Sequence, residues 1–308
     1  MRELDSILAC TGYQITHFQT EWGRAIRGDV RLVVTPDCSV LRLRTNMSIT
    51  GTGTRNMAKT TFAFNSGSNQ IFWKNQPIDK YSLAGFNLKE TRSHYRLEKG
   101  SVMVAVLFDR SNAIKKFDEQ KWDDVFTTLE GCNHVRCDPD PFNQFKKKIL
   151  SKLSKSLLSE PIADQSVLLS AFNLIRTCRQ KNHRLGTGTR HNRLMTVIVA
   201  VARLNNGREG SWVVPDVKEF TRLCEYSNSA VAEACYELYG MPTKQLLTGI
   251  RMENAIQLLK RPVLRNKLGC GHTVKSVADF LQISTRALHE SMLRYRGTTP
   301  RDVQKMAC

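Results

Sequence analysis

Short apolar runs separated by turn-forming residues dominate the first 140 residues. Examples are Val30–Val34, Val40–Leu43 and Val102–Phe108, which are bounded by clusters of Gly, Asn, Asp and Pro. Runs of this length with frequent turn signals are typical of strands in a β-sandwich or small barrel. We therefore predict a β-rich regulatory or dimerisation domain over residues 1–140.

The hydrophobic pattern changes at residues 138–141 (DPDP), after which apolar residues recur at helical intervals. This periodicity predicts helices over Phe145–Leu158 and Ala163–Ile175. Residues 176–191 are polar, basic and free of acidic side chains, so we interpret them as a connector. Residues 141–191 together form the predicted helical and basic connection between two domains.

An internal repeat organises the last region, residues 192–308, which opens with an apolar helix predicted over Leu194–Leu204. Residues 216–240 align without a gap on residues 273–297, and six of the 25 aligned pairs are identical. The apolar positions match as well. Such a repeat predicts one small structural unit made twice.

Each copy of the repeat has the features of a helix-turn-helix unit. In the first copy, Asp216 is placed to cap a short helix, Ser227 to cap a second helix, and Gly240 to end that second helix. Equivalent residues stand 57 positions later in the second copy. The spacing therefore predicts two helix-turn-helix units, in which the second helix is the candidate recognition helix.

A long apolar stripe runs through the segment between the two copies, Thr243–Lys260. One helix of 18 residues spans ~27 Å at 1.5 Å per residue. A rigid spacer of this length is suited to holding two recognition helices about one DNA turn (~34 Å) apart.

The segment Tyr236–Leu259 resembles the stretch that joins the two helix-turn-helix units of AraC/XylS-type transcription regulators. The resemblance covers about residues 192–306, with the lead-in closest to the ethanolamine-regulator-like branch. It implies sequence-specific DNA binding, a regulatory N-terminal domain and, as the usual mode, activation. The matching positions are Gly240, Pro242, Arg251, Ala255 and Leu259, followed by Gly297, Thr299 and Pro300 near the end.

Two features depart from the family pattern. The second unit has residues 280–283 (FLQI) where the family usually has a Gly-Phe turn, and Gly-Met-Pro in the first unit is one residue shorter than usual. We therefore expect an altered angle for the second recognition helix.

Exposed positions early in each recognition helix are the candidate DNA contacts. Arg286 is the strongest candidate reader of a base, because a guanidinium can donate two hydrogen bonds to guanine O6 and N7. Glu233 and Glu290 could accept from cytosine N4 or pair with neighbouring arginines, and we favour pairing. The candidates are Asn228, Ser229, Ala232 and Glu233 in the first unit and Ser284 (also a cap), Thr285, Arg286, His289 and Glu290 in the second.

Three further arginines, Arg294, Arg296 and Arg301, are expected to contact phosphates, which positions a protein on DNA without reading sequence. A solvated surface role is the alternative for each of them. Arg251 lies on the mostly apolar linking helix, so we expect it to be a buried structural partner.

Composition and charge agree with this interpretation. The chain has 308 residues, a hydrophobic content of 41% and a net charge of +18 from 46 Lys+Arg against 28 Asp+Glu. A basic surface of this size attracts polyanions, most often nucleic acid. Nine scattered cysteines suit free thiols in a reducing cytoplasm. The chain shows neither a membrane-spanning apolar run nor a signal-peptide pattern, so we expect a cytoplasmic protein without a membrane partner.

Several other motifs carry little weight. The pentapeptide GTGTR, at 51–55 and 186–190, lacks the Gly-Lys-Ser/Thr of a phosphate-binding loop. Cys132, His134 and Cys137 are metal-ligand types without a second cluster, so we interpret them as loop residues. No catalytic motif is present. We expect no cofactor, no metal and no enzyme activity.

The sequence as a whole predicts an α+β protein: a β-rich N-terminal sandwich or barrel-like domain, then an all-α domain with two helix-turn-helix units joined by a long helix. Its predicted function is that of a transcription regulator that inserts two recognition helices into successive major-groove segments. Candidate partners are promoter DNA, RNA polymerase, a small-molecule or protein effector at the N-terminal domain, and a second copy of the chain. The alternative is a basic protein- or RNA-binding module without sequence-specific DNA recognition.

Overall fold

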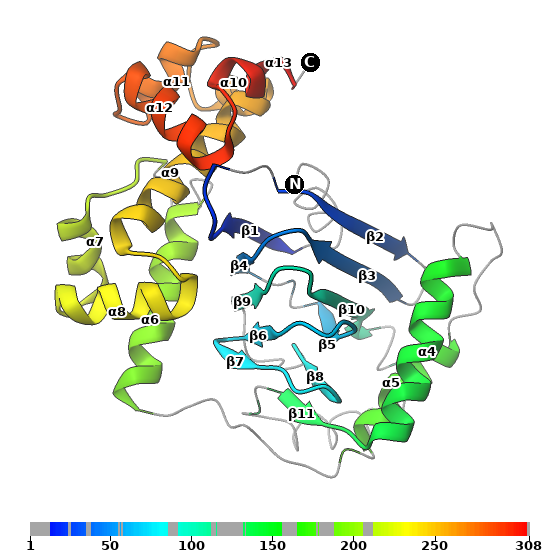
Figure 1. Cartoon of the computed structure of the whole chain (residues 1–308). Helices are drawn as coiled ribbons and strands as arrows, with labels where there is room; N and C mark the ends of the chain where they lie inside the picture. The colour runs from blue at the N-terminus through cyan, green and yellow to red at the C-terminus, as the bar shows by residue number, and fades with distance from the viewer. Residues whose placement is uncertain are drawn as a thin grey trace. The chain divides into compact units, whose positions relative to one another are not determined.

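A computed structural model of the chain (Figure 1) describes residues 13–23, 26–34, 38–54, 56, 58–85, 92–111, 115, 132, 134–155, 165–176, 178, 188–205 and 212–306. The chain divides into two compact units. The β unit comprises residues up to 15 and residues 27–186, and the helical unit comprises residues 16–26 and 187–308. Residues 16–26, within the region that the sequence assigns to the β-rich domain, are thus grouped with the helices.

Two sheets form the β-rich part of the chain, and every strand pair whose register is resolved is antiparallel. The five-stranded sheet has the order β1 (Gln14–Gln19), β4 (Ile49–Thr54), β9 (Arg92–Leu97), β6 (Ile71–Trp73) and β7 (Gln76–Pro77). The six-stranded sheet has the order β11 (His134–Arg136), β8 (Ser82–Ala84), β5 (Lys59–Asn65), β10 (Val102–Asp109), β3 (Cys38–Thr45) and β2 (Gly28–Val34).

Two helices, α4 (Pro139–Lys155) and α5 (Gln165–Arg176), cover one face of the six-stranded sheet. Phe64 of β5 meets Phe142 and Phe145 of α4 at ring-centroid distances of 5.7 and 5.9 Å. Ala63, the residue before Phe64 in β5, points to the other face of the sheet and is also buried. Burial on both faces also explains why β10 in the same sheet carries a nearly continuous apolar run over Val102–Phe108.

The DPDP segment, residues 138–141, ends the strand pattern and also begins a helix. Pro139 is the first residue of α4, and the Asp138 carbonyl accepts a hydrogen bond from the Phe142 amide at 3.1 Å. Proline is tolerated in a first helical turn because its missing N–H would have no partner there. The helix therefore starts six residues before the predicted Phe145, and residues 156–158 of that prediction lie outside the described residues.

Several aromatic residues of the β unit, and parts of the GTGTR and cysteine–histidine motifs, lie in its sheets or core. Phe62 and Phe64 are buried, and Trp73 stacks on Tyr95 at a ring-centroid distance of 6.0 Å. Gly51–Thr54 of the first GTGTR lies in β4. The interpretation of the cysteine–histidine cluster as a loop is wrong for His134, which is buried in β11 because that strand pairs with β8.

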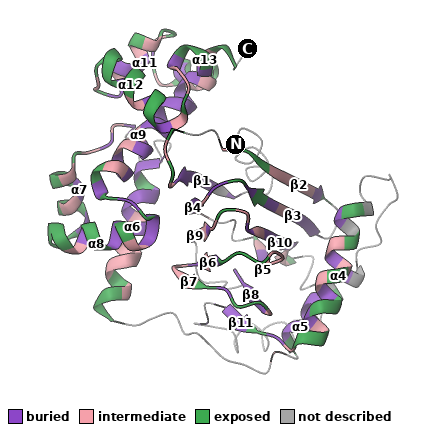
Figure 2. Ribbon diagram, viewed as in Figure 1, coloured by how far each residue is buried: buried purple, intermediate pink, exposed green. Residues whose placement is uncertain are grey.

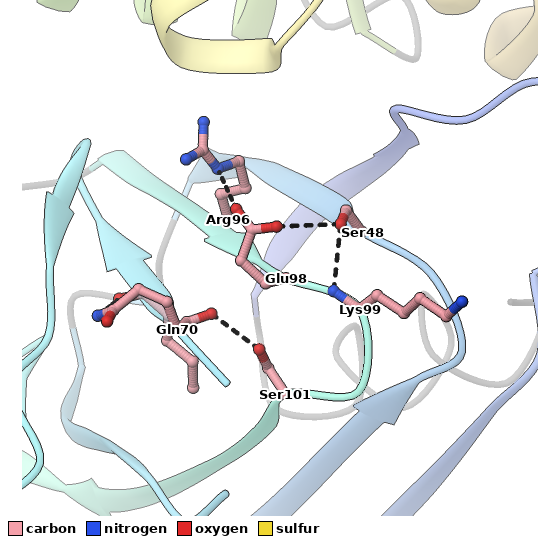
Figure 3. A network of polar contacts seen from close by, with 7 residues as sticks. Ser48, Gln70, Arg96, Glu98, Lys99 and Ser101 are labelled. Atoms are coloured by element: carbon pink, nitrogen blue, oxygen red, sulfur yellow. Dashed lines mark hydrogen bonds and ion pairs between the residues drawn. The ribbon is translucent and has the colours of Figure 1, made fainter. Parts of the chain in front are cut away.

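A polar network closes one end of the five-stranded sheet (Figure 3). Arg96 forms an ion pair with Glu98 at 3.2 Å, and the Ser48 hydroxyl donates to the same carboxylate at 3.2 Å. The Lys99 amide donates to the Ser48 hydroxyl at 3.1 Å. These bonds join the turn after β9 to the turn before β4.

Eight helices are described in the helical unit, and they confirm the register of the repeat. The N-caps, the left-handed residue of each turn and the glycine C-caps recur 57 residues apart. Asp216 and Thr273 accept from backbone amides of the first helices, and Gly240 and Gly297 end the second helices at φ +68° and +65°. The helices are α6 (Thr189–Leu204), α7 (Val217–Cys224), α8 (Asn228–Tyr239), α9 (Thr243–Lys260), α10 (Pro262–Lys267), α11 (Val274–Phe280), α12 (Thr285–Arg296) and α13 (Pro300–Lys305).

The turn of the second repeat closes without glycine. Gln282 adopts the left-handed conformation at φ 56°, and its repeat equivalent Glu225 does the same at φ 57°. Leu281 is buried beside this turn, at 1% exposure. In the second repeat, the turn without glycine is thus closed by one residue in a conformation that non-glycine residues rarely adopt.

The helical unit has two hydrophobic cores, and α9 contributes to both. Leu246 and Ile250 pack in the core of the first repeat, whereas Met252 and Leu258 pack in the core of the second. The predicted linking helix is therefore confirmed over Thr243–Lys260. α6 begins at Thr189, so the last three residues of the predicted connector are helical, while 177 and 179–187 lie outside the described residues. No helix in the described ranges is long and apolar enough to cross a membrane.

Candidate nucleic-acid interface

The exposed face of α8 contains every candidate residue of the first repeat. Asn228, Ser229, Ala232 and Glu233 are exposed, while Val231, Ala234 and Cys235 on the opposite face are buried (Figure 2). The Ser227 hydroxyl accepts from the Ala230 amide at 3.3 Å and so fixes the start of the helix. Tyr236, one turn beyond Ala232, is 64% exposed and extends this face, although the sequence reasoning missed it.

The exposed face of α12 contains Thr285, Arg286, His289 and Glu290. Leu288 and Met292 anchor the helix from the opposite face with no exposed area. The Ser284 hydroxyl accepts from the Ala287 amide at 3.1 Å, which confirms its role as a cap. Arg294, one turn further along, is also exposed. The two faces thus come from equivalent positions of two equally capped helices.

Both candidate glutamates are paired with arginines, as we favoured. Arg193 of α6 contacts Glu233 at 3.0 Å, and Arg286 Nε donates to Glu290 Oε1 at 2.7 Å. The side chains of Arg286 and Glu290 are 88% and 56% exposed, so their pairing contributes only a few tenths of a kcal/mol. Arg286 can therefore leave Glu290 for a base at little cost.

The start of α6 adds two basic side chains beside α8 that the sequence reasoning did not select. Arg190 contacts Glu237 at 2.8 Å, and Arg193 contacts Glu233. The hydrogen bond and charge of Glu237 raise the pKa of Arg190. Since Arg190 is 74% exposed, its guanidinium can also reach an anion in solvent.

The structure corrects the expectation for Arg296. This side chain is only 11% exposed, and its guanidinium forms an ion pair with the buried Glu253 and lies 4.8 Å from the Tyr295 ring centroid. Arg296 therefore stabilises the fold and does not lie on the surface that could meet phosphates. Arg251 has the structural role that we expected but is only partly buried: it donates to the Val214 carbonyl at 2.9 Å, and desolvation lowers its pKa.

A groove of about 690 Å³ adjoins the exposed face of α12. Its basic residues are His272, Lys275, His289 and Arg301, which come from the loop before α11 and from α11, α12 and α13. The sequence reasoning selected His289 and Arg301 but missed His272 and Lys275, because their proximity depends on how the short helices pack. Among the described residues, no group of three or more metal-ligand side chains is brought together.

No protein-family model and no curated protein matches the chain. Among solved structures, the chain is similar to the AraC-like transcriptional activator CuxR, with 9% identity over 76% of this chain and 83% of CuxR and a TM-score of 0.39. It is also similar to ToxT from Vibrio cholerae O395 bound to (E)-4-(8-methylnaphthalen-1-yl)but-3-enoic acid, with 12% identity over 92% of this chain and 100% of ToxT and a TM-score of 0.29. At identities and TM-scores this low, the function of the site is inferred from its own geometry.

Proposed function

We propose that this protein is a sequence-specific, double-stranded DNA-binding transcription regulator of the AraC/XylS type. α8 and α12 would enter successive major-groove segments of a promoter. The observation that carries this proposal is the pair of helix-turn-helix repeats, with equivalent caps 57 residues apart and exposed polar first turns, joined by the 18-residue helix α9. Two such helices on one rigid spacer are the arrangement that two adjacent half-sites require.

The side chains divide into base readers and phosphate contacts in this proposal. Arg286 is assigned to a guanine, where a bidentate contact gives about 1–3 kcal/mol of discrimination. Arg294 and the groove residues Lys275 and Arg301 are assigned to phosphates, as is Arg190 beside α8. Asn228, Ser229, Thr285 and His289 complete the two faces.

The β unit supplies regulation in this proposal. A small-molecule or protein effector at this unit, or its self-association into a homodimer, would change DNA binding or contact with RNA polymerase, and activation is the mode that the resemblance implies. The +18 net charge supports a polyanionic partner but does not select among nucleic acids.

The proposal is tested by selecting bound duplexes from a random double-stranded DNA pool with the full-length protein. We expect enrichment of a bipartite motif whose two halves are about 10 base pairs apart, centre to centre. Structured RNA is added as a competitor in a parallel selection. Failure to enrich any duplex, or complete displacement of the duplex by RNA at equal concentration, would remove sequence-specific DNA binding in favour of the RNA-binding alternative.

A further inference from the structure

One short segment of the chain joins the two cores of the helical unit. Phe18 is buried in the core of the first repeat, at 1% exposure, and Trp22 packs against the core of the second. These two residues are only four positions apart. The segment 16–26 belongs to the helical unit, while the residues that precede and follow it, up to 15 and from 27, belong to the β unit.

The aromatic residues of this segment contact the last turns of the two recognition helices. Phe18 meets Tyr239 of α8 edge-on at a ring-centroid distance of 6.1 Å, and Trp22 meets Tyr295 of α12 edge-on at 5.2 Å. Aromatic pairs in this geometry contribute about 0.5–1.5 kcal/mol each beyond the area they bury. The segment is thus anchored on both recognition helices.

Gln19 adds a polar anchor between the two aromatic ones. Its side-chain amide nitrogen donates to the Tyr295 carbonyl, and its Oε1 accepts from Arg296 at 2.9 Å. Arg296 is in turn paired with Glu253 of α9, which also accepts from the Tyr295 hydroxyl at 2.8 Å. The end of α12 is therefore connected both to the segment and to the linking helix.

The segment runs past the glycine C-caps of both recognition helices. A Cβ on Gly297 would lie 3.4 Å from the Gly23 carbonyl oxygen, and a Cβ on Gly240 would lie 3.9 Å from a Thr20 methyl group. Gly23 itself has a φ of +81°. The same segment therefore passes both C-caps at van der Waals distance.

These contacts leave the candidate DNA-binding faces open. The segment contacts the C-terminal turns of α8 and α12, whereas Ser229 and Arg286 are exposed in their N-terminal turns. A contact at the C-terminal ends positions the two helices without covering their exposed faces. Without the segment, α9 would be the main structural link between the two repeats.

We propose that residues 16–23 form a brace that fixes the relative placement of α8 and α12, and that Phe18, Gln19 and Trp22 thereby determine which half-site spacing the protein accepts. This proposal rests on the proposed function as a DNA-binding regulator. Preorganisation raises affinity for a bipartite site because less rotational freedom is lost on binding. A single half-site gains nothing from the brace.

The test compares wild type with Trp22→Ala in the full-length protein. The probes are the selected bipartite duplex, the same duplex with about one to five base pairs added between its halves, and a single half-site. We expect Trp22→Ala to lose about tenfold in affinity for the bipartite duplex, to flatten the spacing preference, and to bind the half-site like wild type. Trp22→Phe should retain most of the preference, and the exposed neighbour variant Glu21→Ala should match wild type. An unchanged spacing preference in Trp22→Ala overturns the brace.

Hydrogen exchange tests the brace without DNA, so the brace can be rejected independently of the proposed DNA-binding function. The Gly240 amide donates to Tyr236 and the Gly297 amide to Leu293, so both C-terminal turns have reporter amides. We expect Trp22→Ala to accelerate exchange at 293–297 and also at 236–240, which Trp22 does not anchor directly. Acceleration at 293–297 alone would show a local contact and reject the brace, even if the wild type enriched no duplex.

Discussion

The two helix-turn-helix repeats share one backbone plan but anchor the ends of their recognition helices differently. Tyr239 and Arg296 occupy equivalent positions, yet the first packs its ring against Phe18, while the second pairs with Glu253 and Gln19. The first repeat thus uses an aromatic anchor where the second uses a charged one. Caps and turns therefore determine the geometry of the unit, whereas the chemistry at a given position can differ widely.

The exposed faces also differ in charge. The candidate face of α8 has no basic side chain, and its Glu233 is paired with Arg193 of a neighbouring helix. The face of α12 presents Arg286, His289 and Arg294. If both helices enter DNA, the second is expected to supply more of the charged contacts, both to bases and to phosphates.

Removing the charged anchor should have the largest effect on stability. Glu253→Leu leaves Arg296 buried without its carboxylate partner, so we expect the free energy of unfolding of the helical unit to fall by about 3–5 kcal/mol, measured by urea denaturation. Adding Arg296→Met should recover most of the loss. Glu290→Ala, which removes the exposed partner of Arg286, is the control and should cost under about 0.5 kcal/mol. Equal losses in the two glutamate variants would refute the buried role of Glu253.

High pH should destabilise the first core through its two buried thiols. Burial raises the pKa of Cys224 to about 12 and that of Cys235 to about 11, from 9.0, whereas the repeat equivalents are Leu281 and Met292. Because the folded pKa values are raised, this stability is complete below pH 9 and is lost as the pH rises towards 11–12. The slope is about 1.4 kcal/mol per pH unit for each thiol.

The measurement for this prediction is the free energy of unfolding as a function of pH. The variant Cys224→Ala/Cys235→Ala should show a shallower decline above pH 9 than wild type. The comparison uses slopes, so a general loss of stability in the variant does not affect it. Parallel slopes would mean that the thiols of the first repeat ionise as readily in the folded protein as in the unfolded one.

The base-reading role of the second repeat is tested by Arg286→Ala. We expect a loss of about 1–3 kcal/mol on the selected duplex and a much smaller loss on unrelated duplex, measured by fluorescence anisotropy. Arg294→Ala is the matched control, since a phosphate contact should weaken binding to both duplexes alike. If Arg286→Ala lowers the affinity for both duplexes equally, Arg286 contacts the DNA backbone and does not read a base.

Local signals explain why the repeat could be predicted from the sequence. The caps Ser227 and Ser284, the glycines that end the helices and the apolar stripe of α9 all act within a few residues, and the structure has them at the expected places. The burial of Arg296 could not be predicted in this way, because its partner Gln19 is 277 positions away in the chain.

Dependence on contacts that are distant in the sequence also explains why the proposed brace could not be predicted from the sequence. Phe18 and Trp22 lie within and just after β1, and nothing in their local pattern distinguishes a residue of the helical core from a residue of a sheet. A fragment of residues 192–308, which the sequence alone suggests as the minimal DNA-binding domain, would lack both aromatic anchors and Gln19. The helical unit is therefore best studied in the full-length chain.

The smallest effect that we predict tests whether the two caps are equivalent. Ser227→Ala and Ser284→Ala each remove a hydroxyl that accepts from a first-turn amide, so each should lower the free energy of unfolding by about 1 kcal/mol. Ser229→Ala is the control, because Ser229 is exposed and lies inside the helix. A clear difference between the two cap variants, measured by thermal unfolding, would show that one repeat depends on its cap more than the other. The proposed brace predicts equal losses, since it supports the opposite end of both helices and leaves each first turn to its own serine.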